Sequence, residues 1–188
     1  FQRMLDPLEI EVVSAADLGL DLDVAETADS FRGNAALKAR EYFRQAGRPV
    51  IADDSGLAVD ALSGAPGVYS ARYGGVGLDD RGRRLHLLAD LQKTGAGIES
   101  GNPAADLSAR FICVLALCFG EAEPPLYFEG AAEGRILFEE RGQGGFGYDP
   151  IFLDPDSGRS FAELAPEEKD ARSHRGAALR EFLRALEL

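Results

Sequence analysis

The sequence predicts one α/β domain in which a mixed central sheet is flanked by helices. Early in the chain, strand-like apolar runs alternate with helical segments, which is typical of α/β folds. Later, strand-like segments follow one another directly, as antiparallel neighbours do. A chain of 188 residues is also long enough to bury a sizeable core within one domain.

The early segments begin with Leu8–Val13, whose alternation of apolar and polar residues predicts a half-exposed strand. An acidic loop over Asp17–Ser30 leads into a helix predicted over Phe31–Ala46, and the glycine and proline that follow end this helix. Asn34 and Lys38 lie four residues apart and therefore share one face near the helix start.

The short apolar run Val50–Ala52 predicts a buried strand that ends at Asp53 and Asp54. Open α/β sheets keep their ligands at the carboxyl ends of strands, so these acids would lie at the floor of a cleft. The same acids, followed by a serine and a glycine, are also ordinary turn chemistry. The local sequence leaves both interpretations open.

The later segments start with Gly64–Gly75, which is too rich in glycine and proline for a regular element. Structured loops of this length are usually functional or tightly packed. We expect a helix over Leu78–Leu91 and the longest apolar strand over Ala109–Phe119. Leu126–Glu133 and Gly134–Glu139 are predicted to be antiparallel neighbours.

The remaining segments are a flexible connection over Thr94–Asp106, a short strand at Ile151–Leu153 and a last helix. Ser173 is a good N-cap for that helix. Its apolar stripe at helical spacing consists of Ala178, Leu179, Phe182, Leu183 and Leu186.

The net charge is −12, from 20 basic and 32 acidic residues. Binding of a nucleic-acid backbone needs a basic face, so no nucleic-acid partner is expected. A small phosphorylated ligand stays compatible with this charge, because a divalent cation can bridge acids and phosphates. Since neither a secretory signal nor an apolar run of membrane-spanning length is found, we expect a cytoplasmic protein without a membrane partner. Cys113 and Cys118 would face opposite sides of one strand, which argues against a disulfide between them.

One polar cluster combines Glu26 with Asp53 and Asp54. Mg²⁺ takes oxygen ligands and keeps several waters, so such acids can bind it and activate a water for attack on phosphorus. Adjacent residues of an extended chain point to opposite faces, so one aspartate would face the site while the other braces the loop. Glu26 taken alone is more typical of a solvated loop acid.

Two further polar clusters lie near the C-terminal end. The glycines of Gly144–Asp149 would let the backbone approach a ligand, and the aromatics could stack on a base, although a tight hairpin with core aromatics is an equal alternative. The segment is not a Walker loop. The other cluster consists of Lys169, Ser173, His174 and Arg175. His174 and Arg175 lie in the first turn of a predicted helix, where cations oppose the helix dipole at a cost of up to about 1 kcal/mol. That cost indicates a functional reason for them.

Five segments, in order over nearly the whole chain, resemble the non-canonical purine nucleoside triphosphate pyrophosphatases, the inosine triphosphatase (RdgB/HAM1) family. They are Phe31–Ala39, Ile51–Leu57, Gly64–Tyr73, Gly144–Phe152 and Ser173–Gly176. The resemblance implies two lobes with a cleft between them. It also implies Mg²⁺-dependent hydrolysis of dITP, ITP, XTP and dXTP to the monophosphate and pyrophosphate, and a homodimer.

The resemblance also assigns roles to individual residues. Asp54 would be the general base and a metal ligand, Glu26 the second metal ligand, and Asp53 their support, while Lys38 would meet the triphosphate. The substrate-binding residues that it implies are Asn34, Ser55, Phe146, Gly147, Tyr148, Asp149, Lys169, Ser173, His174 and Arg175. Arg and His donors suit the 6-keto group of a purine and reject the amino group of adenine, since donors that face it would be left unpaired.

The chain departs from the family pattern at its start. Family members begin with a strand and a Ser/Thr-x-Asn-x-x-Lys phosphate loop, whereas Phe1–Leu5 resembles the last turn of a helix. We therefore expect a single pyrophosphatase domain over residues 1–188 without that strand and loop. This departure motivates an alternative, a non-catalytic nucleotide-binding module. A phosphatase of the Asp-x-Asp type is rejected because Asp53 and Asp54 are adjacent.

Overall fold

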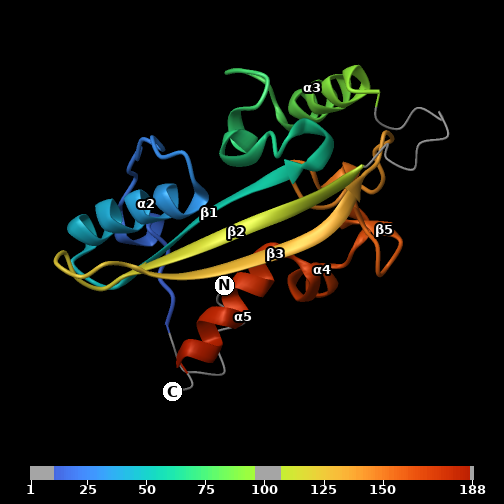
Figure 1. The fold of residues 1–188 in the computed structure, drawn as a ribbon. Helices are drawn as coiled ribbons and strands as arrows, with labels where there is room; N and C mark the ends of the chain where they lie inside the picture. Colours follow the sequence, from blue (N-terminus) through green and yellow to red (C-terminus); the bar gives the residue numbers. More distant parts are fainter. Residues whose placement is uncertain (1–10, 96–106, 187–188) are drawn as a thin grey trace. The chain divides into compact units, whose positions relative to one another are not determined.

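The computed structural model describes residues 11–95 and 107–186, which form two compact units. The first unit comprises the chain up to Asp54, Cys113–Gly130 and the chain from His174 onward, and the second comprises Ser55–Ile112 and Ala131–Ser173. The predicted fold, a central sheet with flanking helices, is confirmed (Figure 1).

The sheet has five strands in the order β1-β2-β3-β4-β5. The strands are β1 (Val50–Val59), β2 (Ser108–Cys118), β3 (Leu126–Ile136), β4 (Phe152–Asp154) and β5 (Arg159–Ser160). Strands β3 and β4 pair antiparallel, as do β4 and β5.

The first unit places one helix on each face of β2. Side chains along a strand alternate between its two faces, so every second residue meets the same helix. Val114, Ala116 and Cys118 pack with α2 (Phe31–Ala46). Cys113 and Leu115 pack with α5 (His174–Leu186). The two cysteines therefore lie in different buried clusters and are both free, as predicted.

Helix α2 has the bounds that the sequence predicts. Ser30 caps its start by accepting a hydrogen bond from the Gly33 N–H, and Gly47 ends it in the left-handed conformation, with φ of 62°. In α5, Ala178, Leu179 and Phe182 are buried as the apolar stripe predicts. Leu186 departs from that prediction, because its side chain is 43% exposed at the end of the helix.

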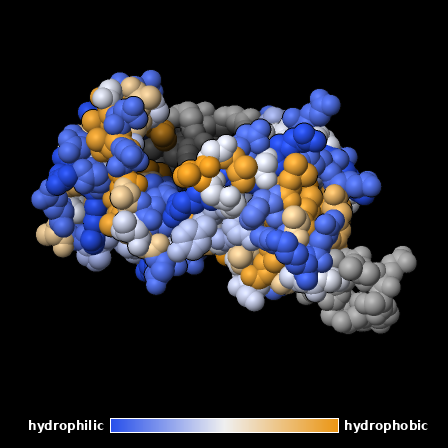
Figure 2. Space-filling model, turned by 90° about the horizontal axis from the view of Figure 1, so that it is seen from above, coloured by the Kyte–Doolittle hydropathy of each residue, from blue (hydrophilic) through white to orange (hydrophobic). Residues whose placement is uncertain are grey.

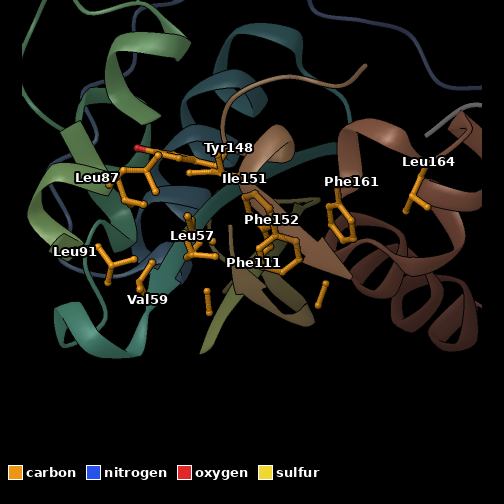
Figure 3. Close-up of a cluster of buried hydrophobic side chains, with 14 residues drawn as sticks. Leu57, Val59, Leu87, Leu91, Phe111, Tyr148, Ile151, Phe152, Phe161 and Leu164 are labelled. Carbon is orange, nitrogen blue, oxygen red and sulfur yellow. The ribbon is translucent and has the colours of Figure 1, made fainter. Parts of the chain in front are cut away.

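The second unit is built around an aromatic core, which Figure 3 shows. The rings of Phe111 and Phe161 are stacked with centroids 5.8 Å apart, and Phe152 lies tilted between them at 4.6 and 4.7 Å. Helix α3 (Asp80–Lys93) contributes buried leucines to this core. Tyr148, in the glycine-rich segment 144–149, and Ile151, just after it, are buried in the same cluster. The loop is therefore attached to the core of its own unit. Helix α4 (Pro166–Arg172) follows later in this unit.

The prediction of a strand that ends at the acids is wrong, as is the alternative of a plain turn. Strand β1 continues from Val50 to Val59, so Asp53 and Asp54 lie in its middle. Strand β1 lies beside β2 in the sheet, and the two carboxylates meet partners on α2 and α5.

The prediction of two strands at Leu126–Glu133 and Gly134–Glu139 is also wrong, because β3 runs through Gly134 without a break. A Cβ at Gly134 would stand 2.4 Å from the Phe152 ring and 2.6 Å from the Leu153 carbonyl oxygen. The glycine is therefore needed for close packing of β4 and does not mark a turn.

Other boundaries differ less. Residues 11–13 form no strand, although Leu8–Val13 was predicted as one, and Val12 and Val13 are exposed. Helix α3 begins two residues later than predicted, where Asp79 caps it by accepting a hydrogen bond from the Gly82 N–H. The helical turn expected at Phe1–Leu5 and most of the connection Thr94–Asp106 lie outside the described residues.

Hydrophilic side chains cover most of the face seen in Figure 2, with separate apolar patches between them. Within residues 11–95 and 107–186, no helix is long and apolar enough to span a bilayer.

Candidate active site

Three polar residues surround Asp54 in the first unit. The Lys38 ammonium donates to Glu26 Oε1 at 2.8 Å and to Asp54 Oδ1 at 2.7 Å. Asn34, one turn earlier on α2, donates weakly to Asp54 Oδ2 at 3.4 Å and accepts from the Ala28 N–H at 3.0 Å. Asn34 therefore connects the loop that carries Glu26 to the strand that carries Asp54. We call Glu26, Asn34, Lys38 and Asp54 the acid cluster.

The acid cluster shifts the pKa of both central groups. Burial raises the pKa of the Asp54 carboxyl above its usual value, because the charged form loses water. The Lys38 ammonium acts against this shift and the charge of Glu26 adds to it. Burial acts to lower the pKa of Lys38, but its hydrogen bonds to Asp54 and Glu26 outweigh this effect and raise it. Lys38 thus stays charged, while the Asp54 carboxylate gains affinity for a proton.

The two adjacent aspartates have different partners. Asp54 is directed at Lys38 of α2, whereas Asp53 accepts from Arg175 of α5, with Oδ2 2.7 Å from Nη2 and 3.2 Å from Nε. This alternation follows from the extended backbone of β1 and agrees with the sequence-based expectation. Asp53 does not belong to the acid cluster, and its observed contact holds a guanidinium.

A second group of predicted residues gathers in the second unit around Asp149, whose side chain is buried. Its Oδ2 accepts from the Phe146 N–H at 2.8 Å and from the Lys169 ammonium. The Lys169 Nζ also lies 4.7 Å from the centroid of the Phe146 ring, a cation–π contact. The Phe146 side chain is 63% exposed. We call residues 144–149 the glycine loop. Lys169 lies beside it, and the Phe146 ring remains exposed to solvent while the backbone of the loop is held by hydrogen bonds.

The glycine loop has partners that sequence reasoning missed. Tyr148 is buried, and its hydroxyl donates to the Ser70 carbonyl oxygen at 3.0 Å. The Gly147 N–H donates to Asp80 Oδ2 at 2.8 Å, and its carbonyl oxygen accepts from Arg84 Nη1 at 2.7 Å. An unusual run of arginines near the start of α3 is the one sequence signal that could have indicated Arg84.

The other predicted residues are placed as follows. Ser55 follows Asp54 in β1 and belongs to the second unit. Ser173 ends α4, where its N–H donates to the Lys169 carbonyl oxygen at 2.7 Å, and its backbone is extended directly before α5. His174 is buried at the first position of α5, so the prediction of a helix start at this point is confirmed.

The donor set of the acid cluster fits a divalent metal ion. Glu26 and Asp54 present carboxylates to one cationic atom, Lys38 Nζ. Proteins often hold Mg²⁺ with one or two carboxylates, while waters and substrate phosphates supply the other oxygens. In the part of the chain that the structure describes, no three His, Cys, Asp or Glu side chains gather as a metal site. Glu26 and Asp54 would therefore supply two of the oxygen ligands of such an ion.

Comparison with known proteins gives one consistent result. A family model described as the Ham1 family matches residues 1–185. The dITP/XTP pyrophosphatase of Halorhodospira halophila is 45% identical over 185 residues, which cover 98% of this chain and 88% of that protein. The dITP/XTP pyrophosphatase of Shigella flexneri is 47% identical over 184 residues, 97% of this chain and 89% of that protein.

Solved structures agree with the sequence matches. A HAM1 protein from Coxiella burnetii superposes with a TM-score of 0.88 at 43% identity, covering 99% of this chain and 90% of that one. A nucleoside-triphosphatase / dITP/XTP pyrophosphatase from Mycobacterium abscessus gives a TM-score of 0.73 at 44% identity, with 96% and 92% covered.

Proposed function

This chain belongs to the Ham1 family, and on that basis we propose that it hydrolyses dITP, ITP, XTP and dXTP to the nucleoside monophosphate and pyrophosphate. Such an enzyme removes non-canonical purines from the nucleotide pool. Relatives that carry the name dITP/XTP pyrophosphatase support this proposal at 44–47% identity. Nothing among these relatives favours the alternative of a non-catalytic nucleotide-binding module.

The acid cluster is the observation that carries the proposal. In our assignment, Asp54 takes a proton from the water that attacks the α-phosphorus, and the bond to the β-phosphate breaks so that pyrophosphate leaves. The raised pKa of Asp54 suits this role, because a carboxylate with higher proton affinity is a better base near neutral pH.

Glu26 and Asp54 would hold Mg²⁺, which supplies positive charge to the phosphates and to the attacking water. Lys38 is assigned to the triphosphate. Its ammonium already lies between the two acids, so it keeps them close together despite their like charges. Asn34 supports this arrangement through its contact with Asp54.

The base of the nucleotide is assigned to the glycine loop and to donors on α4 and α5. Phe146 offers an open aromatic face on which a purine can stack. Lys169, His174 and Arg175 would supply donors for the 6-keto group, and Asp53 would hold the Arg175 guanidinium in one direction. Ser55, Gly147, Tyr148, Asp149 and Ser173 would complete the binding residues.

One assay tests the function directly. We expect Mg²⁺-dependent release of pyrophosphate from dITP and XTP, with little release from dATP or dGTP. Pyrophosphate and orthophosphate are measured in parallel for each nucleotide. Absence of turnover on every nucleotide would refute the enzyme, and orthophosphate as the first product would refute the assignment of the broken bond.

We further propose that the protein is a cytoplasmic homodimer, as the family resemblance implies. Sedimentation equilibrium over a range of concentrations measures the oligomeric state. A mass equal to one chain of 20.1 kDa throughout that range would exclude the dimer.

A further inference from the structure

The glycine loop combines a fixed backbone with an exposed side chain. The Phe146 N–H donates to Asp149 Oδ2, and the Tyr148 hydroxyl donates to the Ser70 carbonyl oxygen. The Phe146 ring nevertheless remains 63% exposed. A large aromatic side chain that is open to solvent on a well-held backbone is suited to binding a flat ligand.

The partners of Gly147 come from a single face of α3. Asp80 accepts from its N–H at 2.8 Å and Arg84 donates to its carbonyl oxygen at 2.7 Å. The two side chains are four residues apart near the start of the helix, so they lie on one face. Gly147 has φ of 58°, in the left-handed region that favours glycine, and both its N–H and its carbonyl oxygen are held by side chains of α3.

Arg84 is a charged residue at a buried position. Its side chain is only 11% exposed, and burying a guanidinium costs free energy unless it is paired. Glu140 accepts from its Nε at 2.9 Å and compensates the charge. Its Nη1 donates to the Gly147 carbonyl oxygen. The buried charge is thus directed at the backbone next to Phe146.

We propose that Asp80 and Arg84 are positioning residues that set the direction of the Phe146 ring and thereby the affinity for the purine base. They touch no substrate in this proposal and act through Gly147. The proposal rests on the proposed function, in which the base stacks on Phe146. It predicts that their loss weakens binding while the chemical step at the acid cluster is preserved.

Steady-state kinetics on dITP test the proposal. In Arg84→Met and Asp80→Ala we expect KM to rise about tenfold while kcat stays within about twofold, since only substrate binding is affected. Arg81→Met is the matched control, because Arg81 is an exposed arginine on the same helix, and it should change neither constant. The proposal would be overturned if kcat fell in both variants as strongly as KM is expected to rise. It would also be overturned if their KM equalled that of the control.

A conservative replacement separates positioning from general stability. Asp80→Asn keeps a side-chain oxygen that can accept from the Gly147 N–H, so KM should return to near the wild-type value. The Asp80 side chain is 49% exposed, and its replacement by alanine is not expected to prevent folding. A KM in Asp80→Asn as high as that in Asp80→Ala contradicts the assigned hydrogen bond.

A spectroscopic measurement tests the same idea without turnover. The sequence contains five tyrosines but no tryptophan, so Phe146→Trp introduces a single indole, which can be excited selectively at wavelengths that tyrosine does not absorb. Adding Arg84→Met should lower the fluorescence anisotropy of that indole, whereas adding Arg81→Met should not. Unchanged anisotropy would refute the positioning role even if the enzyme is active. A change in anisotropy in a protein that releases no pyrophosphate would refute the proposed function alone.

Discussion

The lysine of the acid cluster contacts two carboxylates, whereas Lys169, beside the glycine loop, contacts one. Lys38 is shared between Glu26 and Asp54, so the three charged groups carry a net charge of −1. Lys169 pairs with Asp149, so that pair is neutral. Excess negative charge favours a further cation, whereas a neutral pair next to an aromatic ring favours an uncharged, flat ligand. The difference in charge indicates which region suits the metal and phosphates and which suits the base.

The largest effect is expected at Asp54. Asp54→Asn removes the proposed base and a metal ligand but keeps the size of the side chain, so kcat should fall about 10²–10⁴-fold, the range for loss of a general base. Pyrophosphate release from dITP measures this loss, and circular dichroism confirms that the fold is kept. Retained activity would remove Asp54 from the chemical step.

The two lysines provide the next test of the comparison. Lys38→Met removes the cation that lies between the like charges of Glu26 and Asp54, so we expect kcat/KM to fall about 100-fold, since removing one partner of a buried pair costs a few kcal/mol. Lys169→Met should lower kcat/KM by about tenfold, because the Phe146 N–H still supports Asp149.

The informative quantity is the ratio of the kcat/KM values of Lys38→Met and Lys169→Met. It is measured with dITP at fixed Mg²⁺ concentration, with Lys93→Met as the control, because Lys93 is an exposed lysine that pairs with Asp90. Equal losses in Lys38→Met and Lys169→Met would mean that the two regions do not differ as their charges indicate.

A smaller effect is expected at Asp53. Asp53→Asn weakens the hold on Arg175 but keeps one acceptor, so KM for dITP should rise about threefold to tenfold with little change in kcat, as for a lost charge-assisted hydrogen bond. Selectivity against dATP should fall in the same variant. If Asp53→Asn instead reduces kcat as strongly as Asp54→Asn, Asp53 takes part in the chemical step and does not only support Arg175.

The sequence predicts some of these features because they depend on local pattern. The bounds of α2, the opposite faces of Cys113 and Cys118, and the alternation of Asp53 and Asp54 all follow from helical or strand periodicity. The continuation of β1 through Asp53 and Asp54 does not, because a strand extends by pairing with its neighbour, and β2 lies far away in the sequence.

The same reason explains two other differences. Gly134 interrupts the apolar pattern of β3, but its role is fixed by the Phe152 ring on the neighbouring strand. Arg84 lies 63 residues from its partner Gly147, so no local pattern could connect them. Residue types therefore suggest candidate site residues, whereas the contacts that hold them depend on residues far away in the sequence.

The smallest effect is a pair of opposite pKa shifts at Asp54. Burial raises this pKa, the Lys38 ammonium opposes the rise, and the charge of Glu26 adds to it. Lys38→Met should therefore raise the pKa of Asp54 further, because a cation that stabilises the carboxylate is lost. Glu26→Gln should lower it, because a repelling anion is lost. Carbon-detected NMR titration of the metal-free protein measures both values, with Glu41→Gln as a control on the same helix.

These opposite signs distinguish the acid cluster from a simple ion pair. If Asp54 interacted with Lys38 alone, replacing Glu26 would leave the pKa of the Asp54 carboxyl unchanged. A shift in Glu26→Gln opposite to that in Lys38→Met shows that all three groups share one electrostatic site, because each charge then contributes to the same proton affinity. Shifts of the same sign in both variants would contradict the geometry in which Lys38 lies between two acids.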